Sequence, residues 1–269
     1  MTYRFDRDSA ITTMQRFITG QLLRSGLSGY VVGLSGGIDS AVSCALAVRA
    51  CGADRVLAVL LPYRTSSARS EADARALIDQ LGISFRRVDI SPMIDAYFPT
   101  IDQSNRVRAG NKMARERMSI LFDIAHETNR LVLGTGNRTE ICLGYTTWYG
   151  DSACSVNPIG ELYKTEVREI AKAIGIPDSI ITKTPTADLW QGQTDEGEIG
   201  VTYDTIDRLL TMLVDEGVTS LAHIEAAGLS GADASRVVSM LNRTAFKRRL
   251  PDIAPLGKKP VPERLNLDT

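Results

Sequence analysis

Histidine is scarce in this chain, and its scarcity argues against two kinds of catalytic site. Only His126 and His223 occur in 269 residues, and both fall in helical patterns far from any motif. A histidine-based nucleophilic triad or a zinc site therefore has almost no support. We expect both side chains to lie at the surface.

Cysteine is also sparse, and its spacing excludes the common metal and redox motifs. Cys44, Cys51, Cys142 and Cys154 contain no Cys-x-x-Cys pair. Cys44 and Cys51 lie seven residues apart in a helical pattern, where a small apolar side chain packs well. We expect four reduced thiols without a metal.

Long apolar runs and an excess of one charge are missing too. No run approaches the roughly 20 residues that a membrane span needs, and the first residues lack the order of a signal peptide. Lysine plus arginine (31) and aspartate plus glutamate (32) nearly balance, at a net charge of −1, so no global positive field favours nucleic acid. The sequence predicts a cytoplasmic protein with no membrane or nucleic-acid partner.

What the chain does contain is a regular alternation of strands and helices. Its length suits one large α/β domain, so we expect residues 1–269 to form a single domain. The alternation predicts a doubly wound, Rossmann-like parallel sheet with helices on both faces and extra C-terminal helices. Expected strands are 30–34, 55–61, 84–90 and 130–134, a further connection is expected at 137–145, and expected helices are 8–25, 39–51, 70–81, 108–128, 164–174, 202–216 and 233–248.

A glycine-bearing turn directly follows the first expected strand and has the properties of a phosphate loop. Glycine lets an anion approach the backbone, while hydroxyls and the N–H groups of the next helix offer donors. We expect the whole turn to bind ATP, which comprises Gly33, Leu34, Ser35, Gly36, Gly37, Ile38, Asp39 and Ser40.

Asp39 is the unusual member of this turn, because a carboxylate repels phosphate unless a cation lies between them. Mg²⁺ is the most plausible cation beside a nucleotide. A second glycine turn follows the fourth expected strand and carries Thr135 and Glu140. Since parallel sheets bind ligands where the winding reverses, Asp39 and Glu140 are expected to share one Mg²⁺. The alternative is that Glu140 is an exposed residue in the first turn of a helix, where the helix dipole favours acidic side chains.

The segment 184–200 is polar and glycine-rich, yet it contains Trp190. This composition suits a loop that closes over a ligand. An ordinary surface connection explains the same composition.

Several motifs in fixed order resemble those of the ammonia-dependent NAD⁺ synthetase family, and together they cover nearly the whole chain. The first, Ser35 to Ser40, is shared with the wider ATP-pyrophosphatase group, whereas the ordered series is far more specific. The motifs are Ser35-Gly-Gly-Ile-Asp-Ser40, Gly134-Thr-Gly-Asn-Arg-Thr-Glu140, Tyr149-Gly-Asp151, Asn157-Pro-Ile159, Leu162-Tyr-Lys-Thr-Glu-Val167 and Pro185-Thr-Ala-Asp188.

The resemblance implies a ligase with the adenine-nucleotide alpha hydrolase-like fold. In this family ATP adenylates the nicotinate carboxylate of deamido-NAD⁺ with release of pyrophosphate, and ammonia then displaces AMP. By the same resemblance Thr135, Lys164 and Thr186 contact ATP, while Arg115 and Lys247 contact deamido-NAD⁺. Arg115 could instead form an ion pair with a neighbour on its helix. Lys247 could instead interact with the dipole at a helix C-terminus, which favours basic side chains.

Asp39, Glu140, Lys164 and Asp151 are the expected catalytic residues. Lys164 would add positive charge at the phosphates. Asp151 is the best candidate for positioning ammonia or accepting its proton, because ammonium must lose a proton to become a nucleophile. An Asp that caps its own turn is the structural alternative.

Three positions depart from many family members, which have a lysine at Trp148, an acid at Ser155 and a histidine at Phe246. All three belong to the presumed dinucleotide side. We interpret them as altered contacts and not as lost activity. Trp148 could also be an ordinary core or interface aromatic.

The source of ammonia and the rival functions follow from what surrounds these motifs. The first strand begins near residue 29, which leaves no room for the amidohydrolase domain of glutamine-dependent relatives, so free ammonia is the expected donor. Rival hypotheses are an ATP pyrophosphatase acting on another acceptor, such as a GMP-synthetase-like or tRNA-modifying enzyme, and a non-catalytic ATP-binding module. Family members are homodimers, and the helix near 105–128 could supply the interface.

Overall fold

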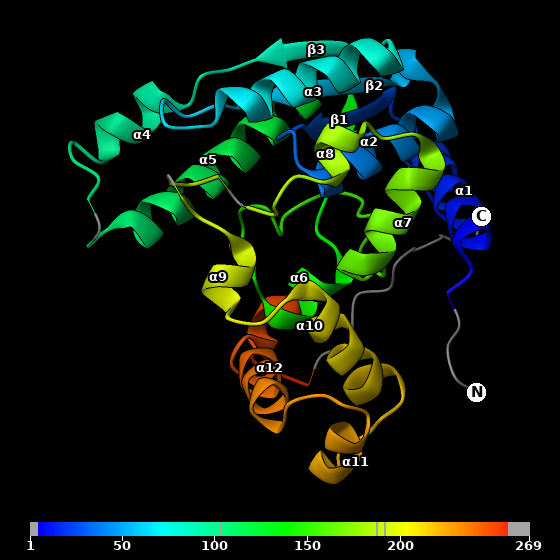
Figure 1. Ribbon diagram of the computed structural model, residues 1–269. Helices are drawn as coiled ribbons and strands as arrows, with labels where there is room; N and C mark the ends of the chain where they lie inside the picture. The colour runs from blue at the N-terminus through cyan, green and yellow to red at the C-terminus, as the bar shows by residue number, and fades with distance from the viewer. Residues whose placement is uncertain (1–4, 103, 187, 191, 258–269) are drawn as a thin grey trace.

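A four-stranded parallel sheet organises the protein, as the computed structural model shows (Figure 1). The structure describes residues 5–102, 104–186, 188–190 and 192–257. The strands are β1 (Gly29–Gly33), β2 (Val56–Leu60), β3 (Ser84–Arg87) and β4 (Arg130–Val132). The longer helices are α1 (Arg7–Ser25), α2 (Ile38–Cys51), α3 (Ala68–Leu81), α5 (Arg106–Glu127), α7 (Lys164–Ile174), α10 (Tyr203–Leu210) and α12 (Gly231–Arg243).

Shorter helices connect these elements. They are α4 (Ser91–Tyr97), α6 (Arg138–Leu143), α8 (Asp178–Ile181), α9 (Asp195–Ile199) and α11 (Leu221–Ala226), with short turns η1 (Ala53–Arg55), η2 (Thr211–Asp215) and η3 (Ala245–Arg248).

The strand order is β3-β2-β1-β4, so the winding reverses between β1 and β4. Tyr30 in β1 lies in register with Val56 of β2 on one side and Leu131 of β4 on the other. Chains that leave β1 and β4 turn in opposite directions, which opens a crevice at their carboxyl ends. The fold therefore confirms the doubly wound sheet and places both glycine turns at one edge.

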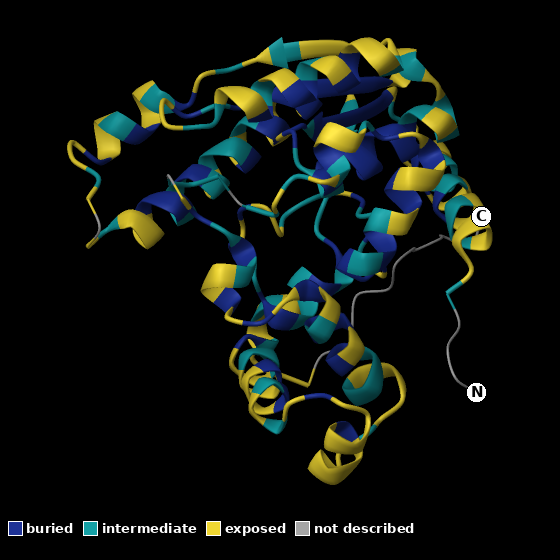
Figure 2. Cartoon of the chain, in the orientation of Figure 1, coloured by how far each residue is buried: buried dark blue, intermediate teal, exposed yellow. Residues whose placement is uncertain are grey.

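The two faces of the sheet carry separate apolar layers. Alternate residues of a strand point to opposite faces: Tyr30 and Val32 pack with α1, α2, α3 and α7, whereas Val31 packs with α4 and α5. Figure 2 shows β1, β2 and most of α2 buried. Tyr30 is fully buried and its hydroxyl donates to the Ile18 carbonyl oxygen at 2.7 Å, which satisfies its polar end.

A third apolar cluster lies at the end of the molecule away from β3 (Figure 1). Helices α10, α11 and α12 pack there around Leu143 of α6 and Tyr163. These are the extra C-terminal helices that the sequence predicts. The helix expected over 202–216 is α10, and it ends in the π-helical turn η2.

The expected elements are found, but some boundaries differ. The strand expected over 84–90 ends at Arg87, and Asp89 instead accepts a hydrogen bond from the Ser91 amide just before α4. The connection expected over 137–145 contains the short helix α6, which Gly144 ends in the left-handed conformation. Both shifts result from turn-forming side chains and glycine that periodicity alone does not weigh.

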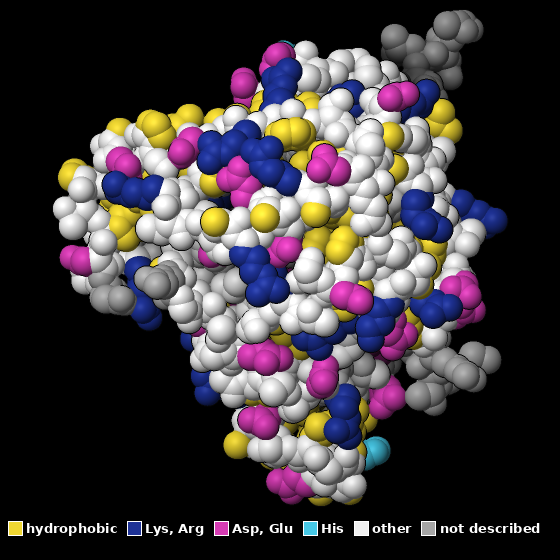
Figure 3. Space-filling model, turned by 45° about the horizontal axis from the view of Figure 1, so that its top comes forward, with side chains coloured by type: hydrophobic (Ala, Val, Ile, Leu, Met, Phe, Trp, Pro, Cys, Tyr) yellow, Lys and Arg dark blue, Asp and Glu magenta, His cyan; other side chains and the backbone are white. Residues whose placement is uncertain are grey.

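The surface is mixed in charge on the face shown in Figure 3, where basic and acidic side chains are interspersed. His126 and His223 are exposed, as expected. Among the described helices, none has the length and apolar character to cross a bilayer.

Candidate active site

A cavity of about 770 Å³ lies at the reversal point between β1 and β4. It brings together residues that the sequence assigns to ATP from four separate segments. These are Gly33, Leu34, Ser35, Gly37, Ile38, Asp39, Ser40, Thr135, Lys164 and Thr186. Asp151, Glu140 and Lys247 line the same cavity.

The phosphate loop is organised by its own hydroxyls. The Oγ atoms of Ser35 and Ser40 lie 3.1 Å apart, Ser40 Oγ donates to the Gly37 carbonyl oxygen, and the Gly37 N–H donates to Ser35 Oγ at 3.2 Å. Gly36 has φ of +75°, and a Cβ on it would lie 2.1 Å from the Ser70 carbonyl oxygen. Only glycine fits this position. Donors at the start of α2 can therefore face an anion in the cavity.

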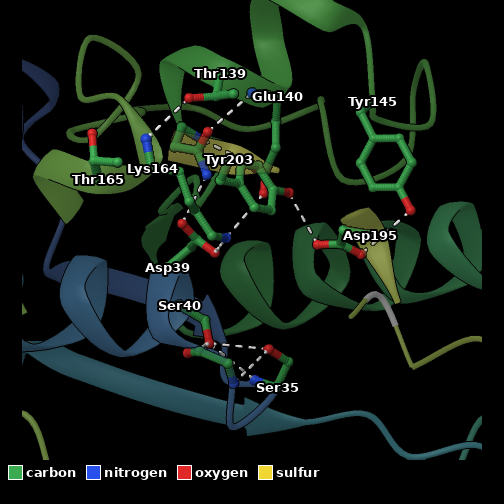
Figure 4. Close-up of polar contacts among 12 residues, drawn as sticks. Ser35, Asp39, Ser40, Thr139, Glu140, Tyr145, Lys164, Thr165, Asp195 and Tyr203 are labelled. Atoms are coloured by element: carbon green, nitrogen blue, oxygen red, sulfur yellow. Dashed lines mark hydrogen bonds and ion pairs between the residues drawn. The ribbon is translucent and has the colours of Figure 1, made fainter. Parts of the chain in front are cut away.

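Lys164 lies between the two carboxylates predicted to share a metal (Figure 4). Its Nζ atom is 2.5 Å from Asp39 Oδ2 and 3.4 Å from Glu140 Oε1. The lysine side chain is only 2% exposed. The structure thus brings Asp39, Glu140 and Lys164 together, but it pairs the ammonium with the carboxylates instead of leaving it free.

Local capping explains why these side chains converge. Asn137 precedes α6 and accepts from the Glu140 amide, while Glu140 Oε2 accepts from the Asn137 amide. This capping box fixes Glu140 at the helix start. Asn137 Nδ2 also donates to Asp39 Oδ1 at 2.8 Å, which joins the two glycine turns.

The first turn of α7 is held from outside the helix. The Lys164 amide donates to Thr139 Oγ1 at 3.0 Å, and the Thr165 amide donates to Asp207 Oδ2 at 2.8 Å. Thr139 Oγ1 in turn donates to Asp207 Oδ1. Two amides that the helix leaves unpaired are thereby satisfied, and the backbone of Lys164 is fixed.

The site carries more negative than positive charge. Burial, and then the charge of Asp39, raise the pKa of Glu140 to about 8, although Lys164 opposes this. Burial lowers the pKa of Lys164, but Asp39 and Glu140 outweigh it and leave that pKa above its ordinary value. One ammonium therefore does not fully offset the burial of two carboxylates, and Glu140 is the one whose pKa rises.

This donor set fits a hard cation. Asp39 and Glu140 supply carboxylate oxygens at the cavity wall, which are the ligands Mg²⁺ prefers. Within the described residues, no group of three or more His, Cys, Asp or Glu side chains could hold a metal. A cation at Asp39 and Glu140 would need its remaining ligands from phosphate and water.

A second polar group adjoins Lys164 on the side of α9 and α10 (Figure 4). The ring of Tyr203 lies 5.1 Å from Lys164 Nζ. Its hydroxyl donates to Asp195 Oδ2, and the Tyr145 hydroxyl lies 3.3 Å from Asp195 Oδ1. The aromatic face adds a favourable contact for the buried ammonium.

Asp151 is a turn residue that also faces the cavity. Its carboxylate accepts from the Thr147 amide at 2.7 Å and from the Thr146 hydroxyl. Burial raises its pKa, against these hydrogen bonds. The structural alternative, a capped turn, is therefore present, and the cavity position keeps the catalytic hypothesis open.

The two cations expected at the dinucleotide differ in position. Lys247 lines the cavity and donates to the Gly144 and Thr146 carbonyl oxygens at 2.8 and 2.6 Å. Arg115 is exposed on α5, and its Nε donates to the Trp148 carbonyl oxygen at 3.1 Å.

The three positions that depart from many family members have ordinary structural partners. The Trp148 ring stacks on Tyr149 and meets Phe246 edge-on at 5.2 Å. Ser155 Oγ accepts from the Val132 amide.

The segment 184–200 lies along the cavity wall and contains α9. Asp188 Oδ2 accepts from the Ser67 amide at the start of α3, and Trp190 lines the cavity under the guanidinium of Arg106. Residues 187 and 191 lie outside the described part. Thr194 caps α9. A threonine followed by acidic residues is a typical helix start, but the polar, glycine-rich composition of the segment favours a loop.

Several cavity residues with polar side chains are not predicted from the sequence, among them Arg117, Asp195 and Lys183. Arg117 donates to the Leu61 carbonyl oxygen, and burial lowers its pKa to about 10. It lies two positions after Arg115 on α5, whereas no local motif singles out Asp195 or Lys183.

The fold and the cavity define a doubly wound α/β protein with a polar cavity at the switch point of its sheet, the place where this class of fold binds its ligands. Residues 10–251 match the family model described as NAD synthase. The chain is 47% identical over 245 residues to the NH(3)-dependent NAD(+) synthetase of Trichlorobacter lovleyi. The matched region covers 91% of this chain and 89% of that protein. The chain belongs to the NAD synthase family.

Solved structures agree with this assignment. The NH3-dependent NAD synthetase from Campylobacter jejuni superposes with a TM-score of 0.79 at 32% identity, over 93% of this chain and 100% of that one. The NMN synthetase from Francisella tularensis gives 0.82 at 34% identity, over 93% and 99%. Both share the doubly wound fold.

Proposed function

We propose that this enzyme makes NAD⁺ from deamido-NAD⁺, ATP and free ammonia, releasing AMP and pyrophosphate. One observation carries the proposal: in a chain of this family, a single cavity joins the phosphate loop to Asp39, Glu140 and Lys164. The whole of 1–269 is proposed to act as one domain. The similarity to NH(3)-dependent NAD(+) synthetases over 91% of the chain does not favour the GMP-synthetase-like, tRNA-modifying or non-catalytic hypotheses.

The first step activates a carboxylate that is otherwise a poor acyl donor. The nicotinate oxygen attacks the α-phosphorus of ATP, and the bond to pyrophosphate breaks. The loop amides with Ser35 and Ser40 would hold the departing pyrophosphate, and the Asp39–Lys164 pair would keep the ammonium close to the developing charge. Adenylation masks the negative charge and makes AMP the leaving group.

Mg²⁺ is proposed as the cofactor at Asp39 and Glu140, where it would neutralise the charge of ATP and pyrophosphate. The raised pKa of Glu140 supports this, because it means that Lys164 alone does not offset the buried negative charge of the site. A cation there would favour the ionised form of Glu140. The capping box around Asn137 would keep that carboxylate in place.

The second step forms the amide. Ammonia attacks the acyl carbon, AMP leaves, and a proton must be removed from nitrogen. Asp151 is the proposed acceptor of that proton, supported by its position on the cavity wall and a pKa that burial raises. Segment 184–200 would exclude water, which otherwise hydrolyses the adenylate.

Lys247 and Arg115 are the proposed contacts for deamido-NAD⁺. Lys247 lines the cavity directly. Arg115 lies beyond it, next to Trp148, so the dinucleotide would extend from the cavity over α5. The similarity to a Francisella NMN synthetase favours a second candidate acceptor, the nicotinate mononucleotide, which has the same carboxylate without the adenosine half.

A homodimer is proposed with α5 at the interface. The helix presents exposed Val107 and Phe122, and these apolar side chains support a contact with a second copy. Packing of α5 on β1 and β4 explains the buried side of the same helix. The cytoplasmic location stays a prediction from sequence.

The deciding experiment measures product formation with ATP, Mg²⁺ and either acceptor, supplying ammonium and glutamine in separate reactions. Equal amounts of NAD⁺ and AMP from deamido-NAD⁺ with ammonium alone would support the proposal. Preference for the mononucleotide would favour the second candidate. Activity with glutamine alone would contradict free ammonia as the donor, and no product with either acceptor would overturn the assignment.

A further inference from the structure

Lys183 connects three segments at the back of the phosphate loop. Its Nζ atom lies 3.2 Å from the Gly36 carbonyl oxygen, 2.9 Å from Ser70 Oγ and 3.2 Å from Asp73 Oδ2. An ammonium has three N–H donors, so these three acceptors match its full capacity. The side chains of Lys183 and Asp73 are 16% and 10% exposed.

The contact with Gly36 fixes a peptide that has little else to hold its orientation. Gly36 and Gly37 lack side chains, and glycine rotates freely between left- and right-handed conformations. The Gly36–Gly37 peptide is held at both ends: its carbonyl oxygen faces Lys183, and its N–H donates to Ser35 Oγ. A reversed peptide would turn the carbonyl oxygen toward the anion.

We propose that Lys183 is a positioning residue for ATP that holds the Gly36 carbonyl away from the phosphates, so that the Gly37 N–H and its acceptor Ser35 Oγ stay on the cavity side. It acts through the loop, because its donors already have partners. Lys183 also directly precedes segment 184–200, which carries Thr186 and Trp190, and it thereby ties that cavity wall to the phosphate loop. The inference rests on the proposed ATP site.

Asp73 provides an independent handle on this arrangement. It belongs to α3 and accepts from the ammonium, whereas the cavity wall is built from its neighbours Ser70 and Glu71. Removing the Asp73 carboxylate releases Lys183 without touching the ligand. Since it sits inside a helix, Asp73→Ala also preserves local helix propensity.

The test measures by calorimetry how tightly the full chain binds α,β-methylene ATP in the presence of Mg²⁺. In this analogue the bond that adenylation breaks cannot be cleaved. Lys183→Met should weaken this analogue about tenfold, the loss of one charged hydrogen-bond network. Asp73→Ala should weaken it about threefold, and the double variant should lose no more than Lys183→Met alone. Affinity for deamido-NAD⁺ should change less than twofold in all three.

Lys172→Met on the exposed side of α7 is the matched control and should bind both ligands as the wild type does. Unchanged analogue affinity in the folded Lys183→Met or Asp73→Ala variant would overturn the inference, as would equal losses for both ligands. If Lys183→Met does not fold, Asp73→Ala alone decides. Failure of the wild type itself to bind the analogue would instead overturn the proposed ATP site.

Discussion

Lys164 Nζ lies 2.5 Å from Asp39 Oδ2, across 125 residues of sequence. This pair joins the phosphate loop to α7 at the base of the cavity. Because Glu140 contacts the same nitrogen, the ammonium is the centre of a buried three-residue cluster.

Lys164→Met should therefore reduce both stability and turnover. The change leaves Asp39 and Glu140 facing one another without a cation, which costs on the order of 3 kcal/mol. We expect a lower midpoint in urea and at least about a hundredfold loss of kcat, the range seen when a charge-stabilising group is removed. Added Mg²⁺ should recover part of the stability but not kcat; full recovery of kcat would show that Lys164 only neutralises the carboxylates.

Asp39→Asn should abolish Mg²⁺-dependent turnover while leaving the fold intact. The amide oxygen can accept from Lys164 or from Asn137 but not from both, so a small loss of stability accompanies the loss of one metal charge. Glu140→Gln should behave alike, since its capping contact with the Asn137 amide survives. The measurement is AMP release against Mg²⁺ concentration. Wild-type turnover at saturating Mg²⁺ in either variant would remove that residue from the metal site.

Arg115→Ala should weaken deamido-NAD⁺ binding more than ATP binding. The guanidinium lies beside Trp148 and outside the region of the phosphate loop, so its loss acts on one substrate. We expect about a tenfold increase in Kd, typical of a lost charge-assisted hydrogen bond. Calorimetry with each ligand separately measures it, and equal losses for both would reassign Arg115 to a structural role.

Asp207→Asn should lower turnover although Asp207 lies behind the cavity wall. The carboxylate is 4% exposed and accepts from both Thr139 and the Thr165 amide, so an amide must leave one donor unmatched. We expect a loss of about 1–3 kcal/mol in unfolding free energy and a lower kcat at temperatures where the variant is folded. Asp204→Asn, on the exposed side of the same helix, is the control and should match the wild type.

Glu166 should make stability depend on pH. Burial raises its pKa to about 7 from an ordinary 4.5, opposed by the Tyr163 amide and Arg138 and reinforced by Asp207 and Glu169. Between those two values the folded chain binds more protons than the unfolded chain, so the unfolding free energy should fall as pH rises through this window, by on the order of 3 kcal/mol. Urea titrations from pH 4.5 to 7.5 measure the slope.

Glu166→Gln should flatten that dependence, because glutamine still accepts from the Tyr163 amide without a charge. Glu161→Gln, at an exposed acid just before α7 that is not among the groups acting on Glu166, should leave it unchanged. A slope that persists in Glu166→Gln would assign it to Asp207 or another buried carboxylate.

The sequence predicts best those features that depend on neighbouring residues within one helix or strand. Apolar runs and glycine caps locate β1, β2, α2 and α7 within a residue or two, because each pattern is completed within one element. Two glycine turns, at the ends of the first and fourth expected strands, predict a shared site at the reversal between β1 and β4. The sequence alone therefore predicts that Asp39 and Glu140 belong to one site.

The less predictable part depends on contacts between distant segments. Lys164 was expected at the phosphates, yet its carboxylate partners set its position, and only the packing of α7 on α2 reveals this. Lys183 stands 147 residues from Gly36 and sits in an ordinary polar stretch. Asp207 resembles any acid on an amphipathic helix until α10 packs against the start of α7.

The C-terminal end of the described chain returns to the cavity late in the sequence. Thr244 contacts the Leu143 carbonyl oxygen, and Lys247 bridges the Gly144 and Thr146 carbonyl oxygens. During synthesis, β1 to β4 leave the ribosome more than a hundred residues before Lys247 does. A nascent chain can thus form its sheet and phosphate loop early, but the proposed acceptor pocket stays incomplete until Lys247 has emerged, so the two halves of the site mature at different times.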